Sequence, residues 1–315
     1  MKILLISQYA EEIKQGIIPS NPLYRIHFLN YHLKVYQALL NLGHQVIISD
    51  GIVVEELIRY IMSCELIFPI RHDYGYSNGD VLIRLLCKKY DKKCIGANIA
   101  SRFYDTDKIV GKLLCKRLKI PTIDYFLPYQ ISNPTFAGPY LLKPRFSASS
   151  ANLSDSCIFD NAEDLRKALN NIPNPECFFI EKFVLGTTAT IGCIIGDDNH
   201  LILGEPYTLT SKTNKIISFE DKRNGGCVRT ALTDKIVRRK IKHYTDKYFR
   251  EIQPCQIARL DFILTQDKKL FFLEINETPN LSATGGFAQL FVEKKFNTYE
   301  NFINHLIKTA ISLNR

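Results

Sequence analysis

The sequence contains no tryptophan and only two methionines, and no apolar run in it approaches the roughly eighteen uninterrupted residues that suggest a membrane-spanning helix. Its first twelve residues carry one lysine and four apolar residues in a row, which Ser7 interrupts. Such a short apolar run predicts a first β-strand rather than a secretory signal peptide. We therefore expect a protein that neither spans a membrane nor associates with one.

The cysteines argue against disulfides and structural zinc. There are nine of them, an odd number, with no CxxC pair and no Cys/His cluster of zinc-site spacing. Most stand in apolar runs, where a free cysteine behaves as a small hydrophobic residue; these are Cys64, Cys87, Cys115 and Cys193. This usage indicates a reducing compartment. We expect a cytoplasmic protein.

Acidic charge is in the minority. The chain has 41 Lys and Arg residues against 32 Asp and Glu residues, which gives a net charge of +9 and a pI near 9.0. A basic surface favours anionic ligands in general. The basic residues are spread along the chain, and the densest group, residues 235–247, follows the pattern of a solvated helix face. Because no RNA- or DNA-reading motif accompanies the charge, we do not expect a nucleic-acid partner.

Strand and helix patterns alternate in the first third of the chain. The predicted strands cover residues 2–7, 45–49 and 66–70, and the predicted helices cover residues 23–42 and 81–87. This rhythm predicts a parallel sheet covered by helices, a small α/β unit that ends at about residue 97. A chain of 315 residues with 46% hydrophobic content can fold as one large domain or as two to three small ones.

The most informative segment is residues 257–282, in which two alternating apolar runs flank a polar turn and predict a β-hairpin. Strict alternation places Phe272, Glu274 and Asn276 on one face of the second strand. Folding the hairpin at its polar turn brings Asp261 of the first strand nearly opposite Glu274. Acidic and amide side chains therefore gather at one point of a strand pair that is otherwise apolar.

These side chains indicate a metal site. Asp261, Glu274 and Asn276 offer hard oxygen ligands, and Arg259 shares a face with Asp261. Oxygen ligands beside an arginine are typical of a magnesium site that also handles phosphate. The alternative is a solvated strand face; the apolar neighbours of Glu274 and Asn276 argue against it, since unpaired buried charge is costly.

Two further segments suit phosphate, each weakly by itself. In residues 140–153 a strand ends at Lys143, and a loop of small hydroxyl residues follows whose backbone can approach phosphate oxygens closely. Lys108 stands at a helix start, an unfavourable place for a cation unless an anion binds there. The alternatives are an ordinary serine-rich loop and one exposed lysine among many.

Residues 178–188 suit the base of a nucleotide. An adenine pocket needs an apolar slot with a few hydrogen bonds at its edge. Glu181 and the backbone near Phe183 and Val184 can supply them. The alternative is a strand end whose charges face solvent.

The order and spacing of these segments resemble the ATP-grasp enzymes, and most closely the D-alanine–D-alanine ligases, over nearly the whole chain. The family pattern is DK before a helix, KPxxxGSSxG, a strand ending in Glu, RxDF and E-[VI]-N-x-x-P-G. Here these segments read Asp107-Lys108, KPRFSASSAN, FFIEKF, Arg259-Leu-Asp261-Phe and EINETPN. The segment RHDYGYSNGD also looks like the family's HGxxGEDG, with His72 and Gly79 in register.

The resemblance implies an α/β chain with the ATP-grasp fold, whose C-terminal part is α+β. Residues 1–97 would form a Rossmann-like pre-ATP-grasp domain, residues 98–180 a central ATP-grasp subdomain, and residues 181–315 a C-terminal subdomain with the metal and substrate site. ATP and a pair of magnesium ions, for which Mn²⁺ can substitute, would be the cofactors. The partners would be small amino-acid-like substrates and a second copy of the chain in a homodimer.

The resemblance also assigns roles to individual residues. The nucleotide would contact Lys108, Lys143, Ser149, Ser150, Glu181, Phe183, Val184 and Thr188, the last of which stands at the family's ribose-binding glutamate. The metal ligands would be Asp261, Glu274 and Asn276. The catalytic residues would be Ser149, Arg259 at the oxyanion of the tetrahedral intermediate, and Lys222 or Lys215 on a segment that resembles the family's ω-loop. The substrates would lie near His72, Ser282 and Ala283.

The family reaction is ATP-driven ligation of a carboxylate to an amine through an acyl phosphate, with release of ADP and phosphate. This chain departs from the family near the substrates: Ala148 and Asn152 replace loop glycines, and the first strand lacks the family's glycine pair. We therefore expect an amino-acid or peptide ligase with a specialised substrate. D-alanine–D-alanine ligase proper, an ATP-grasp phosphotransferase and a non-catalytic nucleotide-binding protein are the alternatives.

Overall fold

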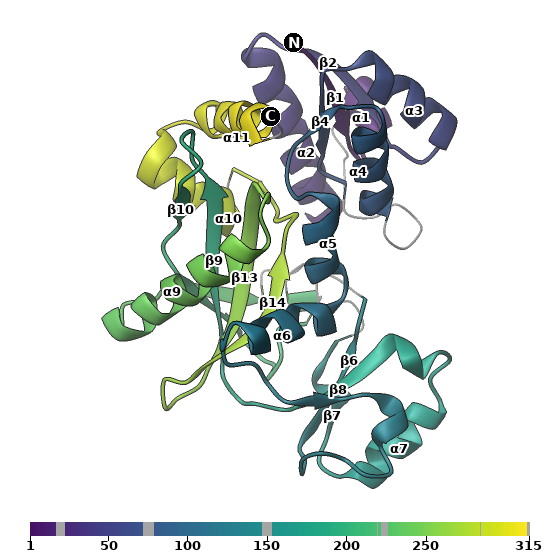
Figure 1. The fold of residues 1–315 in the computed structure, drawn as a ribbon, viewed down its shortest axis with the longest axis vertical. Helices are drawn as coiled ribbons and strands as arrows, with labels where there is room; N and C mark the ends of the chain where they lie inside the picture. Colours follow the sequence, from purple (N-terminus) through teal and green to yellow (C-terminus); the bar gives the residue numbers. More distant parts are fainter. Residues whose placement is uncertain are drawn as a thin grey trace.

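The computed structural model describes residues 1–16, 23–71, 79–146, 153–218, 220–221, 226–283 and 285–313, with the backbone alone over residues 23–28 (Figure 1). The strands are β1 (Lys2–Ile6), β2 (Gln45–Ser49), β3 (Leu66–Pro69), β4 (Lys93–Cys94), β5 (Tyr125–Phe126), β6 (Tyr140–Pro144), β7 (Ile158–Phe159), β8 (Phe178–Lys182), β9 (Thr187–Ile195), β10 (Leu201–Leu203), β11 (Tyr207–Ser211), β12 (Cys227–Ala231), β13 (Ile257–Leu264) and β14 (Leu270–Asn276). The helices are α1 (Ala10–Lys14), α2 (Leu23–Asn41), α3 (Val54–Ser63), α4 (Gly79–Lys89), α5 (Ile99–Thr106), α6 (Lys108–Arg117), α7 (Ala162–Asn170), α9 (Lys235–Glu251), α10 (Gly286–Phe291) and α11 (Tyr299–Leu313). Within these described ranges no helix has both the length and the apolar character to cross a membrane.

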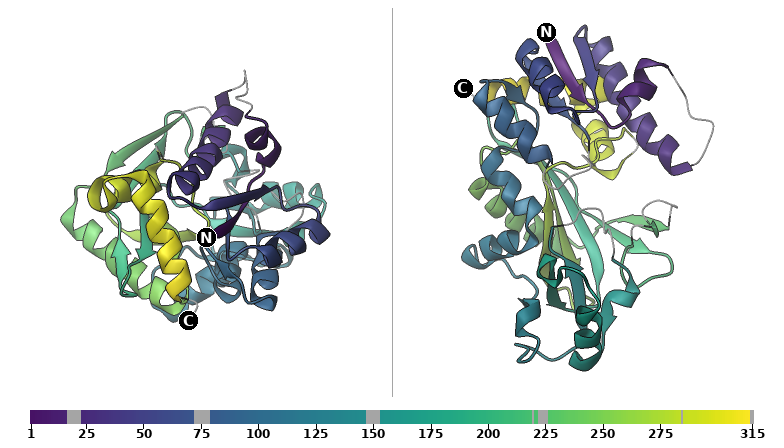
Figure 2. Two further views of the ribbon diagram at one scale, coloured as in Figure 1. Left: turned by 90° about the horizontal axis from the view of Figure 1, so that it is seen from above. Right: turned by 90° about the vertical axis from the view of Figure 1, so that its right-hand side faces the viewer.

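The N-terminal unit is a parallel sheet with helices on both faces, as the sequence predicts. Its strand order is β2-β1-β3-β4. Successive residues of a strand point to opposite faces, so Leu4 and Ile6 of β1 pack under α3 and α4, while Ile3 and Leu5 pack under α2 and α11. The last helix of the chain therefore returns to the first sheet (Figures 1 and 2). The predicted 1–97 unit is incomplete without it.

Two further sheets, whose strand pairs are antiparallel, form the rest of the molecule. The central sheet has the order β5-β8-β6-β7 and carries α7, and the larger sheet has the order β12-β11-β9-β13-β14, with β10 beside β9 (Figure 1). Strand β8 continues to Lys182, so the boundary predicted after residue 180 falls inside a strand, and we move it beyond Lys182. Helix α6 packs on the larger sheet through Leu114 and Cys115. The division into three subdomains stays a prediction.

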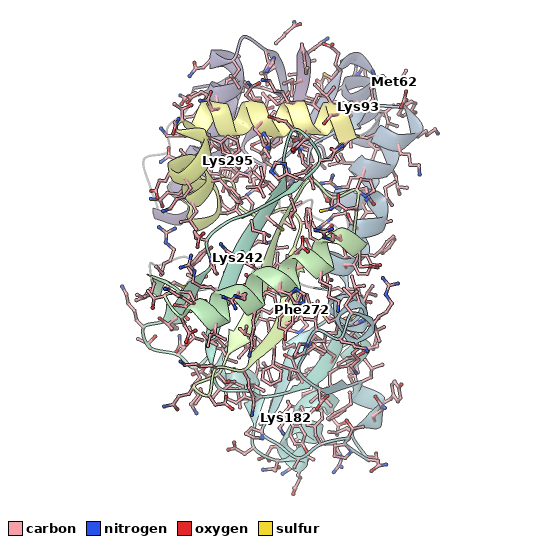
Figure 3. The ribbon with its side chains drawn as sticks, turned by 60° about the vertical axis from the view of Figure 1, so that its left-hand side comes forward. Met62, Lys93, Lys182, Lys242, Phe272 and Lys295 are labelled. Atoms are coloured by element: carbon pink, nitrogen blue, oxygen red, sulfur yellow. The ribbon has the colours of Figure 1, made fainter. Side chains whose placement is uncertain are left out.

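The β13–β14 hairpin contains a bulge that strict alternation does not predict. Asp261 lies opposite Glu274, but the next residue of β13 lies opposite Phe272, so Leu273 is an extra residue on β14. An extra residue shifts the alternation of its strand by one. The prediction that Phe272 shares a face with Glu274 is therefore wrong: Phe272 is buried against Tyr248 of α9, with ring centroids 5.0 Å apart. Figure 3 labels Phe272 beside α9.

The buried ring of Phe272 predicts a large effect on stability. We expect Phe272→Ala to lower the free energy of unfolding by roughly 3–5 kcal/mol, because it removes a filled core volume that Tyr248 and Phe262 enclose. Urea unfolding measures the change. The control is Phe103→Ala, since Phe103 is 53% exposed. A loss below about 1 kcal/mol for Phe272→Ala would contradict the packing.

Candidate active site

The larger sheet brings the predicted metal-binding residues to one face. Asp261 and Glu274 are directly opposite each other across β13 and β14, and Asn276 follows Glu274 by two residues, opposite Arg259. Opposed residues of an antiparallel pair have Cβ atoms about 4.5–5.5 Å apart. The sequence predicted this convergence, and the bulge at Leu273 preserves it, because the bulge lies on the turn side of Glu274.

Asp261 is held in place by neighbouring side chains. Its side chain is 5% exposed. Arg259 donates to it from Nε to Oδ1 at 3.1 Å and from Nη2 to Oδ2 at 2.8 Å, and Thr190 Oγ1 donates to Oδ1 at 2.8 Å. Burial alone would lower the pKa of Arg259, but attraction to Asp261 and their hydrogen bonds raise it above its ordinary value. Arg259 therefore stays charged at this face of the sheet.

The ligand chemistry fits a magnesium ion. Each carboxylate oxygen has two lone pairs, so Asp261 can accept from Arg259 and still bind a cation. Asn276 Oδ1 is oriented by the backbone N–H of Thr278, at 3.0 Å. In the described part of the chain no three His, Cys, Asp or Glu side chains gather as a metal cluster. Asp261 and Glu274 would hold the ion together with an amide oxygen, that of Asn276.

A buried cluster of lysines lies where the central sheet meets α6. Lys108, Lys112 and Lys143 are 7%, 0% and 4% exposed, and Glu181 is 0% exposed. Lys143 Nζ lies 3.1 Å from Glu181 Oε2, and Lys112 forms an ion pair with Glu181 Oε1. Three ammonium groups thus gather around one fully buried carboxylate, and Glu274 and Asp105 also attract Lys108. Burial lowers the pKa of Lys108, and Lys143 acts in the same direction, whereas attraction to Glu274 of the hairpin opposes them more strongly than Lys143 contributes.

The cluster changes the interpretation of Glu181. The sequence assigned it to the edge of an adenine pocket, whereas both carboxylate oxygens face ammonium groups. The backbone N–H of Phe183 donates to the carbonyl of Pro139 at 2.8 Å and is not available to a base. Val184 is half-buried beside it, and Thr188 lies on β9, two residues from Thr190 on the same face of the sheet.

The remaining predicted residues divide into two groups. His72, Ser149, Ser150 and Lys222 lie outside the described residues. Lys215 is exposed, and its backbone N–H and that of Ile216 donate to Asp155, at 3.0 Å each, which ties its segment to the central subdomain.

Ser282 and Ala283 belong to a tight loop between β14 and α10. Ser282 is 5% exposed. Its backbone N–H donates to Asn280 Oδ1 at 2.7 Å, and its carbonyl accepts from the N–H of Gly285 at 2.8 Å. Ala283 is half-buried. The loop is thus fixed by its own hydrogen bonds beside the larger sheet.

Sequence reasoning missed Lys112 and a buried ionic network that supports the metal-binding strand. Arg84 and Arg102 both pair with Asp80, at 2.9 and 2.7 Å, and Arg102 also pairs with Asp105. Asp105 Oδ2 accepts the backbone N–H of Glu277, at 2.8 Å, directly after Asn276. Helical spacing is the signal for two of these pairs, because Arg84 follows Asp80 by four residues and Asp105 follows Arg102 by three.

The network also contains Glu277, whose carboxyl group is fully buried. It is 0% exposed, and burial raises the pKa of its carboxyl to about 8, although Arg102 and Arg84 act in the opposite direction. The network joins α4 and α5 to the end of β14, so it fixes the backbone on which Asn276 stands.

We expect Asp105→Ala to destabilise the fold and weaken metal binding. The substitution removes the acceptor of the Glu277 N–H and one partner of Arg102, a loss of roughly 1–3 kcal/mol for buried polar groups left unsatisfied. Urea unfolding and a magnesium titration of nucleotide turnover measure the two effects. The control is Asp246→Ala, which breaks only the helical pair with Arg250 on the surface of α9. Equal behaviour of the two variants would contradict the supporting role of the network.

Comparison with known proteins agrees with the fold. Residues 130–308 match the family model described as "D-ala D-ala ligase C-terminus". The chain is 24% identical over 268 residues to D-alanine--D-alanine ligase B of Clostridium tetani, an alignment that covers 79% of this chain and 71% of the relative.

Solved structures show the same fold over nearly the full length of both chains. D-alanine--D-alanine ligase from Bacillus anthracis complexed with ATP superimposes with a TM-score of 0.71 at 13% identity, covering 100% of this chain and 98% of that one. The VanG D-Ala:D-Ser ligase from Enterococcus faecalis gives 0.71 at 12% identity, covering 98% and 99%. The family model spans more than half of the chain, and the chain therefore belongs to the D-Ala–D-Ala ligase family, with an α/β ATP-grasp fold.

Proposed function

We propose that this protein is an ATP- and magnesium-dependent ligase that joins a small, amino-acid-like carboxylate to an amine. The reaction passes through an acyl phosphate and releases ADP and phosphate. The observation that carries the proposal is the placement of Asp261, Glu274 and Asn276 on one face of the hairpin, with buried Lys108 close enough to interact with both Glu274 and Lys143. Family membership supports an ATP-dependent ligase.

Different side chains have different roles in phosphoryl transfer. Magnesium, when bound, neutralises charge on the phosphates; Asp261, Glu274 and Asn276 would hold it. Lys108 and Lys143 bind the phosphates of the nucleotide, and Glu181, with Lys112, orients Lys143 and offsets part of the buried positive charge. Catalysis then depends mostly on positioning and charge neutralisation, as in other phosphoryl transfers.

Arg259 acts in the second half of the reaction. Its Nε and Nη2 bind Asp261, which fixes the guanidinium plane. The remaining N–H groups can donate to the oxyanion that forms when the amine attacks the acyl carbon. Because Asp261 is in turn fixed by Thr190, the donors are preorganised before the substrates arrive.

The substrates lie near Ser282 and Ala283, with Ser149, Lys222 and His72 completing the site from segments outside the described residues. Proteins with this fold differ in the second substrate that they use, since the Enterococcus faecalis structure is that of a D-Ala:D-Ser ligase. We place the reaction in the cytoplasm, and a homodimer stays a prediction.

The decisive variants are Asp261→Asn and Glu274→Gln. Each removes one negative charge from the metal site, and we expect ADP and phosphate release to fall by roughly a hundredfold or more. The assay is a screen of amino acids and dipeptides with ATP and magnesium, read as free phosphate. Circular dichroism verifies folding, and Glu163→Gln, which alters an exposed pair on α7, is the control.

Two results would contradict the proposal. Near-normal turnover of either variant would show that the metal site is assigned wrongly. Formation of ADP and a phosphorylated acceptor without free phosphate would identify a phosphotransferase on the same fold instead.

A further inference from the structure

Arg229 reaches from the edge strand β12 toward the face of the sheet that carries the metal-binding residues. Its guanidinium lies over the ring of Tyr207 on the neighbouring strand β11, 5.8 Å from the ring centroid, and its Nη2 donates to Gln289 Oε1 of α10 at 3.0 Å. An arginine side chain is flexible unless it is held. The contacts with Tyr207 of β11 and Gln289 of α10 fix the orientation of the Arg229 side chain, although the residue is exposed.

Two glycines allow α10 to come this close to the sheet. A Cβ atom at Gly192 of β9 would lie 2.7 Å from the ring of Phe287, and one at Gly286 would lie 2.9 Å from both Arg229 Nη1 and Tyr207 Oη. Both distances are shorter than real Cβ contacts, so a side chain at Gly192 would displace Phe287 of α10, and one at Gly286 would displace the ends of the Arg229 and Tyr207 side chains. The first turn of α10, which continues the loop of Ser282, is therefore packed directly against Arg229.

Arg229 and Tyr207 lie next to the metal-binding residues on the same face of the larger sheet. Tyr207 is in register with Thr190, which is in register with Asp261 and hydrogen-bonds to it. Two strand spacings place Tyr207 and Asp261 roughly 10 Å apart along the sheet. Tyr207 is 7% exposed, and both Arg229 and Arg259 act on its hydroxyl, against the stronger effect of burial, which raises its pKa. Tyr207 thus interacts electrostatically with both guanidinium groups.

The two arginines differ in how their charge is compensated. Arg259 is neutralised by Asp261. Arg229 makes no ion pair with any residue in the described ranges, and its hydrogen-bond partner Gln289 is neutral. Gln289 in turn donates to Glu293 at 2.6 Å, which fixes the orientation of its amide so that the oxygen faces Arg229. A fixed guanidinium with unused N–H groups matches a carboxylate, which it can bind through two parallel hydrogen bonds.

We propose that Arg229, with Tyr207 and Gln289, forms a subsite for an acidic group on the amine-bearing substrate. This inference rests on the proposed ligase function and deepens it: the acceptor is an amino acid with a second, side-chain carboxylate. This subsite lies beside the loop of Ser282, on the same face of the sheet as Asp261, with Tyr207 about two strand spacings from that residue.

The test compares acidic amino acids with their uncharged amides. Aspartate and glutamate of both configurations, and asparagine and glutamine, serve as acceptors in the phosphate-release assay. We expect kcat/KM to favour an acidic acceptor over its amide by about tenfold to a hundredfold, the effect of one charged hydrogen-bonded pair. Arg229→Gln should abolish the preference, and Arg229→Lys should retain part of it. The control Arg250→Gln, which alters an exposed helical pair, should leave the preference intact.

Equilibrium binding separates failure of the subsite from failure of the ligase. Calorimetry with the same amino acids, in the presence of magnesium and a non-hydrolysable ATP analogue, requires no turnover. Tighter binding of acidic acceptors to the native chain, lost in Arg229→Gln, supports the subsite even if no ligation is detected. Equal affinity for acid and amide, or a preference that Arg229→Gln leaves unchanged, overturns it, whatever the ligation assay shows.

Discussion

The pairing of β13 with β14 is the constraint on which the site depends. It places Asp261 opposite Glu274 and Arg259 opposite Asn276, so that one strand pair carries two carboxylates, an amide and a guanidinium on one face. The opposite face must fill the core under α9, and the bulge at Leu273 reconciles the two demands. A shift of register by one residue would turn the acids into that core, where unpaired charge is costly. Fold stability and metal-site geometry are therefore specified by the same register.

Charge compensation organises the rest of the site. Two buried acids of the site have cations: Asp261 has Arg259, and Glu181 has Lys112 and Lys143. The lysine cluster carries more positive charge than Glu181 can balance, which suits the polyanionic tail of a nucleotide. On the substrate side, Arg229 is likewise unbalanced. An excess of buried or fixed positive charge thus marks the places where anionic ligands are proposed to bind, and it agrees with the net charge of +9.

The sequence predicts local features of this site better than contacts between distant segments. The period-two runs and the polar turn define the hairpin, and the opposition of Asp261 and Glu274 follows from its length. Phe272 was assigned to the wrong face because a bulge has no signal in an alternation of apolar residues. Lys112 was not singled out from the sequence, since its partner Glu181 is 69 positions away and no local pattern joins them. Arg229 lacks any motif, and its position depends on how closely α10 packs on the sheet.

The most direct test of the account is crystallography of the protein with Mn²⁺ and a non-hydrolysable ATP analogue, using the anomalous signal of manganese to locate the ion. The account predicts an anomalous peak in contact with oxygen atoms of Asp261, Glu274 and Asn276, with the phosphates of the analogue between that peak and the ammonium groups of Lys108 and Lys143. A peak elsewhere, or an analogue bound away from the β13–β14 hairpin, would contradict it.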